Sequence, residues 1–151
     1  MTDIAVVLDF SINLPSPMEK LMELSEDFEN LPKYLPDQLK SVRILEQKDN
    51  ETRTEEIIVF STIIKKEIIQ ETIHKKKEDD ELITEIISGP AKGTTINVKF
   101  LKKDSGTNIS FNIDLKLQLK AKILQPLIKK YYKVILTSVL YRMNNEILEN
   151  N

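Results

Sequence analysis

The chain has 151 residues, of which 40% are hydrophobic and 30% are charged, and its 24 acidic and 22 basic residues leave a net charge of −2. This composition is typical of one soluble domain spanning residues 1–151, and it excludes a disordered chain. It provides no overall basic charge for nucleic-acid binding, and the lack of cysteine excludes disulfides, thiolate metal sites and cysteine nucleophiles.

The N-terminal segment alternates apolar and polar residues, which predicts a β-strand over residues 3–13 with one buried face. The segment carries Asp3 and Asp9 and lacks a basic start, so it does not have the pattern of a signal peptide. No apolar run approaches the ~20 residues of a membrane-spanning helix. We therefore expect a cytoplasmic protein without a transmembrane segment.

Two short helical segments are expected after this strand. In LPSPMEKLMEL, Ser16, Pro17 and Glu19 have the spacing of a capping box, with proline at the first helical position. The segment DFENLPKYLPDQ predicts a second, shorter helical piece, because Pro32 and Pro36 limit its length.

Six further strands are expected next in the chain. They are LKSVRILEQ, TRTEEIIVFSTI, EIIQETIHK, LITEIIS, TTINVKFLKK and TNISFNIDLKLQL. Because the turns between them are short, consecutive strands must be antiparallel neighbours. The strict alternation of the last two strands predicts that Phe100, Phe111 and Ile113 face the C-terminal helix, with Lys99 and Asn112 on the opposite face.

The segment ISGPAKG, residues 87–93, contains two of the three glycines and invites comparison with a phosphate-binding loop. The spacing is wrong for such a loop, because Lys92 precedes Gly93 and Pro90 removes one N–H donor. A strand pattern follows, where a phosphate-binding loop would open a helix. We interpret Gly89 to Gly93 as a hairpin turn.

From about Lys122 to Glu149 the apolar residues recur at helical spacing, which predicts one helix of ~40 Å. Its apolar face runs from Ile128 to Met143, and Asn144 lies on the polar side. A sheet with one apolar face needs a cover. We therefore predict an α+β helix-grip fold, in which a seven-stranded curved antiparallel sheet wraps around the long C-terminal helix, with two short helices after the first strand.

This order of elements, the segment DFENLPKYLPDQLKSVRILE (27–46) and the Gly-Pro turn together resemble the START-related, birch-pollen-allergen-like helix-grip superfamily, SRPBCC. Within it, the chain is similar to the polyketide cyclase and coenzyme-Q-binding branch over nearly its whole length. Members of that branch often carry an aromatic residue early in the sixth strand, where this chain has Ile96 and Asn97. The resemblance implies a cavity between sheet and helix that binds lipids, sterols, quinones or polyketides.

The resemblance also implies that apolar side chains from the sheet and helices line this cavity, and a closed core is the alternative. Tyr132 would add a polar group to the wall, and Met143 would add an adaptable surface. The predicted ligand-binding residues are Phe10, Phe28, Leu31, Tyr34, Phe60, Ile96, Val98, Phe100, Phe111, Ile113, Tyr132, Leu136, Val139, Leu140 and Met143.

A cyclase-type enzyme with His74 or Glu85 as acid–base residue is a second interpretation. His74 lies beside a lysine run near a turn, so we expect a solvated edge position for it, and a single histidine does not predict a metal site. Glu85 lies between Ile83 and Ile87 on a strand with two apolar faces, so alternation does not decide which face points inward. We expect a solvated Glu85.

A ribosome- or protein-interaction module is the third interpretation. Lys129, Lys130 and Lys133 lie beside tyrosines in IKKYYKV, which resembles an RNA-contact patch, and some members of the superfamily act as ribosome-associated toxins. The polar side of an amphipathic helix explains these lysines equally well. The preferred prediction is a monomeric, non-catalytic binding or carrier protein for a hydrophobic small molecule, with no cofactor.

Overall fold

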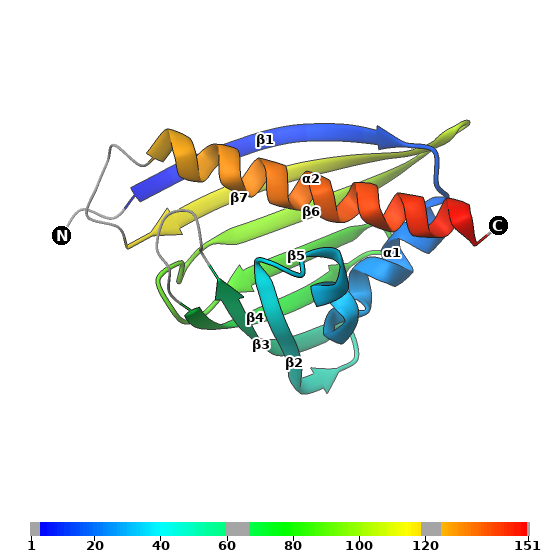
Figure 1. Cartoon of the computed structure of the whole chain (residues 1–151). Coiled ribbons are helices and arrows are strands. Elements are labelled where there is room, and N and C mark those ends of the chain that lie inside the picture. Colours follow the sequence, from blue (N-terminus) through cyan, green and yellow to red (C-terminus); the bar gives the residue numbers. More distant parts are fainter. Residues whose placement is uncertain (1–3, 60–66, 119–124, 151) are drawn as a thin grey trace.

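The computed structural model describes residues 4–59, 67–118 and 125–150 (Figure 1). The elements in chain order are β1 (Ile4–Leu14), α1 (Met18–Glu26), the 3-10 helix η1 (Phe28–Tyr34), β2 (Leu39–Lys48), β3 (Glu51–Val59), β4 (Glu67–Lys77), β5 (Glu81–Ile86), β6 (Thr95–Lys103), β7 (Gly106–Leu117) and α2 (Gln125–Glu149). Four predicted boundaries fall outside the described residues. They are the start of the first strand at residue 3, the ends of the strands TRTEEIIVFSTI and TNISFNIDLKLQL, and the start of the long helix at Lys122.

The seven strands form one antiparallel sheet in the order β1-β7-β6-β5-β4-β3-β2. The sheet is curved, and α2 lies along its inner side while α1 and η1 sit near the C-terminal end of α2 (Figure 1). The predicted α+β helix-grip architecture is therefore confirmed.

The register of the last two strands places their apolar side chains in the core. Phe100, Phe111 and Ile113 are buried, whereas Lys99 and Asn112 are exposed. This alternation confirms the predicted facing of β6 and β7. Phe111 pairs with Phe10 of β1, and the two rings stack with their centroids 4.7 Å apart.

The glycine-bracketed segment is a turn between β5 and β6, as predicted. Gly89 and Gly93 have φ angles of +90° and +95°, a region that glycine occupies without strain. The backbone N–H of Gly93 donates to the carbonyl of Ile86 over 2.8 Å, which closes the turn.

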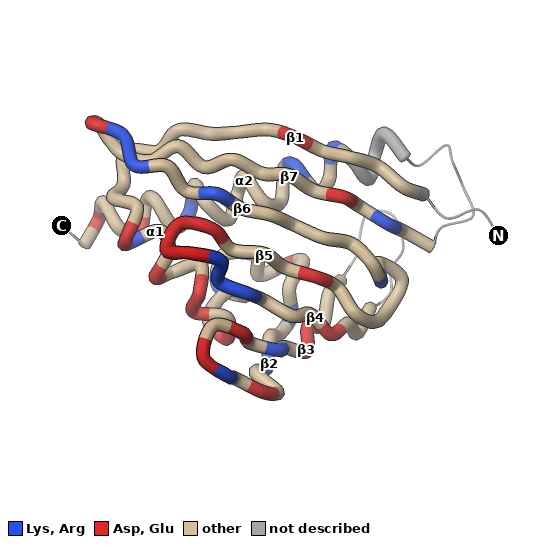
Figure 2. The backbone as a smooth tube through the Cα atoms, turned by 180° about the vertical axis from the view of Figure 1, so that it is seen from behind, with Lys and Arg blue, Asp and Glu red and all other residues tan. Residues whose placement is uncertain are grey.

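Charged residues of both signs are distributed over the outer side of the sheet and its turns (Figure 2). A run of four acidic residues, Glu78 to Glu81, marks the β4–β5 turn, and Lys75 to Lys77 precede it directly on β4. The described residues therefore form no single basic surface in this view.

Ser16 joins the start of α1 to α2, so the predicted capping box is wrong. Pro17 occupies the N-cap position, and no side chain caps the helix. The Ser16 hydroxyl and backbone N–H instead donate to Oδ1 of Asn144, the N–H over 3.2 Å. Asn144 was expected on the polar side of the helix, but it is buried because it is the hydrogen-bond partner of Ser16.

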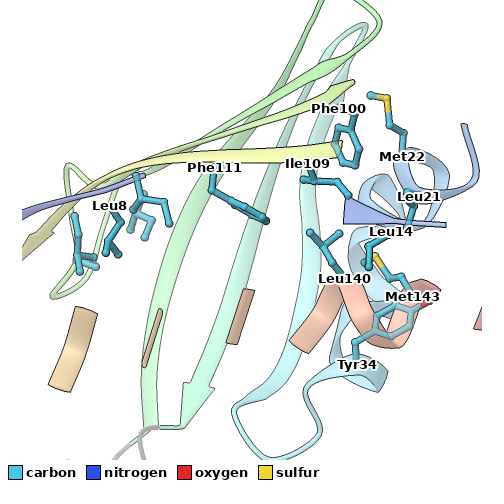
Figure 3. Close-up of a cluster of buried hydrophobic side chains, with 14 of the residues drawn as sticks. Leu8, Leu14, Leu21, Met22, Tyr34, Phe100, Ile109, Phe111, Leu140 and Met143 are labelled. Atoms are coloured by element: carbon cyan, nitrogen blue, oxygen red, sulfur yellow. The ribbon is translucent and has the colours of Figure 1, made fainter. Parts of the chain in front are cut away.

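The neighbours of this junction in the sequence, Leu14 and Met143, belong to the main hydrophobic cluster (Figure 3). There Leu14 and Leu21 lie beside Met143 of α2, and Phe100 and Ile109 of the sheet complete the cluster. The C-terminal half of α2 is thus fixed by both apolar packing and buried hydrogen bonds.

Replacing Asn144 by alanine should lower the free energy of unfolding by about 1–3 kcal/mol. It leaves the buried backbone N–H of Ser16 without an acceptor, and it leaves the Ser16 hydroxyl only the longer contact of 3.4 Å to the carbonyl of residue 144. Chemical denaturation measures this change. Asn145→Ala is the matched control, since Asn145 is the next helical residue and is exposed. Equal effects of the two substitutions would contradict the structural role of Asn144.

Candidate ligand-binding cavity

A cavity of about 250 Å³ lies between the sheet, the short-helix region and α2. Several predicted ligand-binding residues do line it, on η1, β6, β7 and α2. They are Phe28, Leu31, Ile96, Val98, Phe100, Phe111, Tyr132, Leu136, Val139, Leu140 and Met143. Whether these side chains contact a ligand stays a prediction.

Other predicted residues have different positions. Ile113 is fully buried in the core, and Phe10 packs against Phe111. The hydroxyl of Tyr34 donates to Glu146, and burial, followed by this hydrogen bond, raises the pKa of Tyr34 to about 12. Ile113, Phe10 and Tyr34 are therefore not part of the cavity lining. Phe60 lies outside the described residues.

The remaining lining contains the polar residues of the cavity, called here the polar wall, interspersed with Ile58, Leu82 and Ile86. Of the polar residues, only His74 was considered from the sequence, as the acid–base residue of a cyclase. The polar wall is formed by inward-facing residues of β3, β4 and β5, with Ser25 from α1. The lining residues that were not predicted as ligand-binding are Ser25, Glu56, Ile58, Gln70, Thr72, His74, Leu82, Thr84 and Ile86.

His74 lies inside the molecule, so the expected solvated edge position is wrong. Its strand, β4, is an inner strand between β3 and β5, and only 12% of the His74 side chain is exposed. Its Nε2 atom lies 2.9 Å from the hydroxyls of Thr54 and Thr72, and its Nδ1 atom lies 2.9 Å from that of Thr84. The ring of Phe28 stacks on the imidazole with the centroids 4.3 Å apart.

The buried acid is Glu56 on β3, whereas Glu85 is exposed on β5, as expected. Leu82, Thr84 and Ile86 are the residues of β5 that face inward. The Glu56 side chain is 12% exposed, and its Oε2 atom lies 3.6 Å from Nε2 of His74.

Hydrogen bonds hold the Glu56 carboxylate in place. Gln70 donates to Oε1 over 2.8 Å, and Thr72 donates to Oε2 over 3.1 Å. Burial acts to raise the pKa of Glu56, but the hydrogen bond and charge of His74, with the hydrogen bonds from Gln70 and Thr72, outweigh it and lower the pKa. The carboxylate is therefore ionised at neutral pH.

Tyr132 is the polar group on the helix side of the cavity. Burial, reinforced by Tyr131 and by the charge of Glu56, raises the pKa of its hydroxyl far above the ordinary value. Lys130 and Lys133, the described lysines of the same segment, are exposed, and the side chain of Lys129 lies outside the described residues. The segment thus presents lysines to solvent and Tyr132 to the cavity.

A second hollow of about 230 Å³ adjoins the cavity at the end of the sheet where β2 turns into β3. Its wall is polar and includes Glu26 and Asn50. Phe28, His74 and Leu82 line both spaces, so the stacked pair of Phe28 and His74 forms part of the boundary between them.

Comparison with known proteins identifies the family. The model of the family described as polyketide cyclase / dehydrase and lipid transport matches residues 14–144. The chain belongs to this family. A search of curated proteins found no match to the sequence.

Solved structures share the fold of this family member at low sequence identity. TTHA0849 from Thermus thermophilus is 18% identical, with a TM-score of 0.79 over 98% of this chain and 99% of that one. A START superfamily protein from Mycobacterium smegmatis is 12% identical, with a TM-score of 0.78 over 96% and 99%. The Zhui aromatase/cyclase from Streptomyces sp. R1128 is 10% identical, with a TM-score of 0.79 over 95% and 96%. These structures confirm the fold, and the family match over residues 14–144 confirms the predicted resemblance.

Two features are absent from the described residues. None of their helices is both long enough and apolar enough to span a membrane. No three of their histidine, aspartate and glutamate side chains are grouped so as to hold a metal ion.

The substitution Glu56→Gln should lower the free energy of unfolding by about 1–3 kcal/mol at neutral pH, because it removes a hydrogen-bonded buried carboxylate. Since the pKa of Glu56 is lowered in the folded state, its stabilisation is present above the ordinary value of 4.5 and is lost as the pH falls through the folded-state pKa. The difference between wild type and variant should therefore shrink toward acidic pH.

Urea denaturation at several pH values measures this difference. Glu85→Gln is the matched control, since it removes the same charge from an exposed position. A difference between wild type and Glu56→Gln that stays constant or grows on acidification would contradict the assigned role of Glu56.

Proposed function

We propose that this protein binds or carries a hydrophobic small molecule, of lipid, quinone or polyketide type, in the cavity between the sheet and α2. The observation that carries the proposal is the continuous apolar wall formed by β6, β7 and α2 around about 250 Å³ of space. Membership of a family described by polyketide cyclase, dehydrase and lipid-transport activities supports it.

The size of the cavity restricts the ligand. Pockets for drug-sized molecules usually have volumes of roughly 300–1,000 Å³, so about 250 Å³ suits a compact ligand of one or two rings or a single short chain. Burial of apolar surface contributes ~25 cal/mol per Å². Because association and ordering offset much of this gain, we expect micromolar affinity.

Cyclase-type catalysis is a second candidate function, and the position of His74 favours it. The imidazole lies in the cavity wall within hydrogen-bond distance of three threonines and 3.6 Å from the Glu56 carboxylate. Histidine beside a carboxylate is a common general acid–base arrangement. In this version Glu56 replaces Glu85, which faces away from the cavity.

Mass analysis of a ligand recovered after binding separates the two functions. A carrier returns the ligand unchanged, whereas an enzyme returns a product, and His74→Gln should then abolish product formation while ligand uptake persists. Native mass spectrometry of the purified protein would also identify a molecule that co-purifies with it.

The substitution Leu136→Trp should fill the cavity and weaken binding of the neutral fluorescent probe N-phenyl-1-naphthylamine about tenfold or more, because Leu136 lies in the cavity wall. Fluorescence titration measures the affinity, and circular dichroism checks the fold. Val134→Trp is the matched control, since Val134 lies on the same helix with 51% exposure.

If the apolar wall is instead a closed core, wild type should not bind the probe. Leu136→Trp should then overpack the core and cost about 1–3 kcal/mol of stability. That pair of results would overturn the binding proposal.

A further inference from the structure

The described lining of the cavity contains an acidic side chain but no lysine or arginine. Glu56 is the only carboxylate among the described lining residues, and no lysine or arginine is among them. An anionic group placed in this space would therefore meet the Glu56 carboxylate. Among the described lining residues, the only side chain that can become a cation is His74, which already lies 3.6 Å from that carboxylate. A donor group would meet an ionised acceptor.

The Glu56 carboxylate can accept a further hydrogen bond. An ionised carboxylate offers about four acceptor positions and no donor. Thr72 donates to Oε2, and Thr54 and Nε2 of His74 lie 3.4 Å and 3.6 Å from the same atom, whereas Oε1 accepts from Gln70 alone among the described residues. Thr54 and Thr72 are 0% and 1% exposed, whereas the Glu56 side chain keeps 12% exposure. The accessible acceptor of this group is therefore the carboxylate itself.

Of the other polar groups in the lining, His74 already has hydrogen-bond partners, whereas Tyr132 has none among the described residues. Both ring nitrogens of His74 already have threonine hydroxyls within 2.9 Å, so the imidazole is engaged within the polar wall. The hydroxyl of Tyr132, on the opposite wall, makes no hydrogen bond to another described residue. Glu56 and Tyr132 both belong to the lining of this cavity, and the charge of Glu56 is one of the causes that raise the pKa of Tyr132.

We propose, on the basis of the binding function above, that this cavity selects an apolar ligand carrying one hydrogen-bond donor, a hydroxyl or an ammonium group, which donates to the Glu56 carboxylate. Tyr132 hydrogen-bonds the same polar group from the helix side. Ligands whose polar group is a carboxylate, such as free fatty acids, are rejected because they place like charges together at a site of low dielectric constant.

Three naphthalene compounds of matched shape test this selectivity: 2-(1-naphthyl)ethylamine, 2-(1-naphthyl)ethanol and 1-naphthylacetic acid. At about pH 7.5 the first is a cation and the last an anion, so both are charged and differ in the sign of the charge. Titration by fluorescence or calorimetry should show that the amine binds about tenfold or more tightly than the acid. Equal binding of amine and acid to wild type would overturn the proposal without any variant.

Substitutions then assign the effect to a residue. Glu56→Gln keeps the shape and removes the charge, so the ratio of amine to acid affinity should fall toward one. Glu85→Gln removes the same charge outside the cavity and should leave the ratio unchanged. An unchanged ratio in a folded Glu56→Gln variant, or an equal fall in Glu85→Gln, would overturn the assignment to Glu56.

The neutral alcohol separates this inference from the binding function itself. If the alcohol binds wild type and Leu136→Trp blocks it, the cavity is a binding site whatever the charge selectivity. If none of the three compounds binds, both the binding function and the selectivity fail. Tyr132→Phe should weaken binding of the amine and of the alcohol, and an unchanged affinity for both would remove Tyr132 from the site.

Discussion

The cavity depends on how α2 is held: along β1 on one side, and by α1 and η1 at its C-terminal end. The backbone of α2 approaches β1, α1 and η1, and its other approaches to the sheet are weaker. Its C-terminal half is fixed by the Ser16–Asn144 hydrogen bonds, by the Tyr34–Glu146 hydrogen bond and by an ion pair of 2.8 Å between Lys33 and Glu146. Because the sheet curves away from a helix held in this manner, space remains over the middle strands.

The division of the cavity into an apolar and a polar wall follows from this geometry. Strands β1, β6 and β7 contribute to the main core with α2, and their buried residues are apolar except for Thr107. The inward positions of β3 and β4 are not covered by the backbone of α2, and they carry Thr54, Glu56, Gln70, Thr72 and His74. Since these side chains bond to one another across the strands, polar groups are accommodated in the interior with their hydrogen bonds satisfied.

The sequence was sufficient to predict the fold and the apolar wall, but not the polar wall. Alternation in β7 is strict, so the inward face of Phe111 could be assigned from period two alone. In β3 both faces contain polar residues, and no local signal distinguishes the inward Glu56 from its outward neighbour Glu55. The pairing of β3 with β4 settles the facing of His74, because it aligns Thr54 with Thr72 and Thr52 with His74. Which residues of two strands pair is a property of the tertiary structure, so the pattern within one strand does not predict it.

The energetics of the polar wall indicate why it belongs to a site rather than to the general core. Burying a carboxylate costs free energy, and its hydrogen bonds compensate that cost without exceeding what well-packed apolar residues of similar size would contribute. At Glu56 the compensation requires Gln70, Thr72 and His74 together. Stability alone would be served equally well by an apolar strand such as β7. In the proposed binding function, Glu56 and Tyr132 would supply direction, because an apolar cavity holds any molecule of the right size, whereas an acceptor and a hydroxyl in its lining orient a polar group.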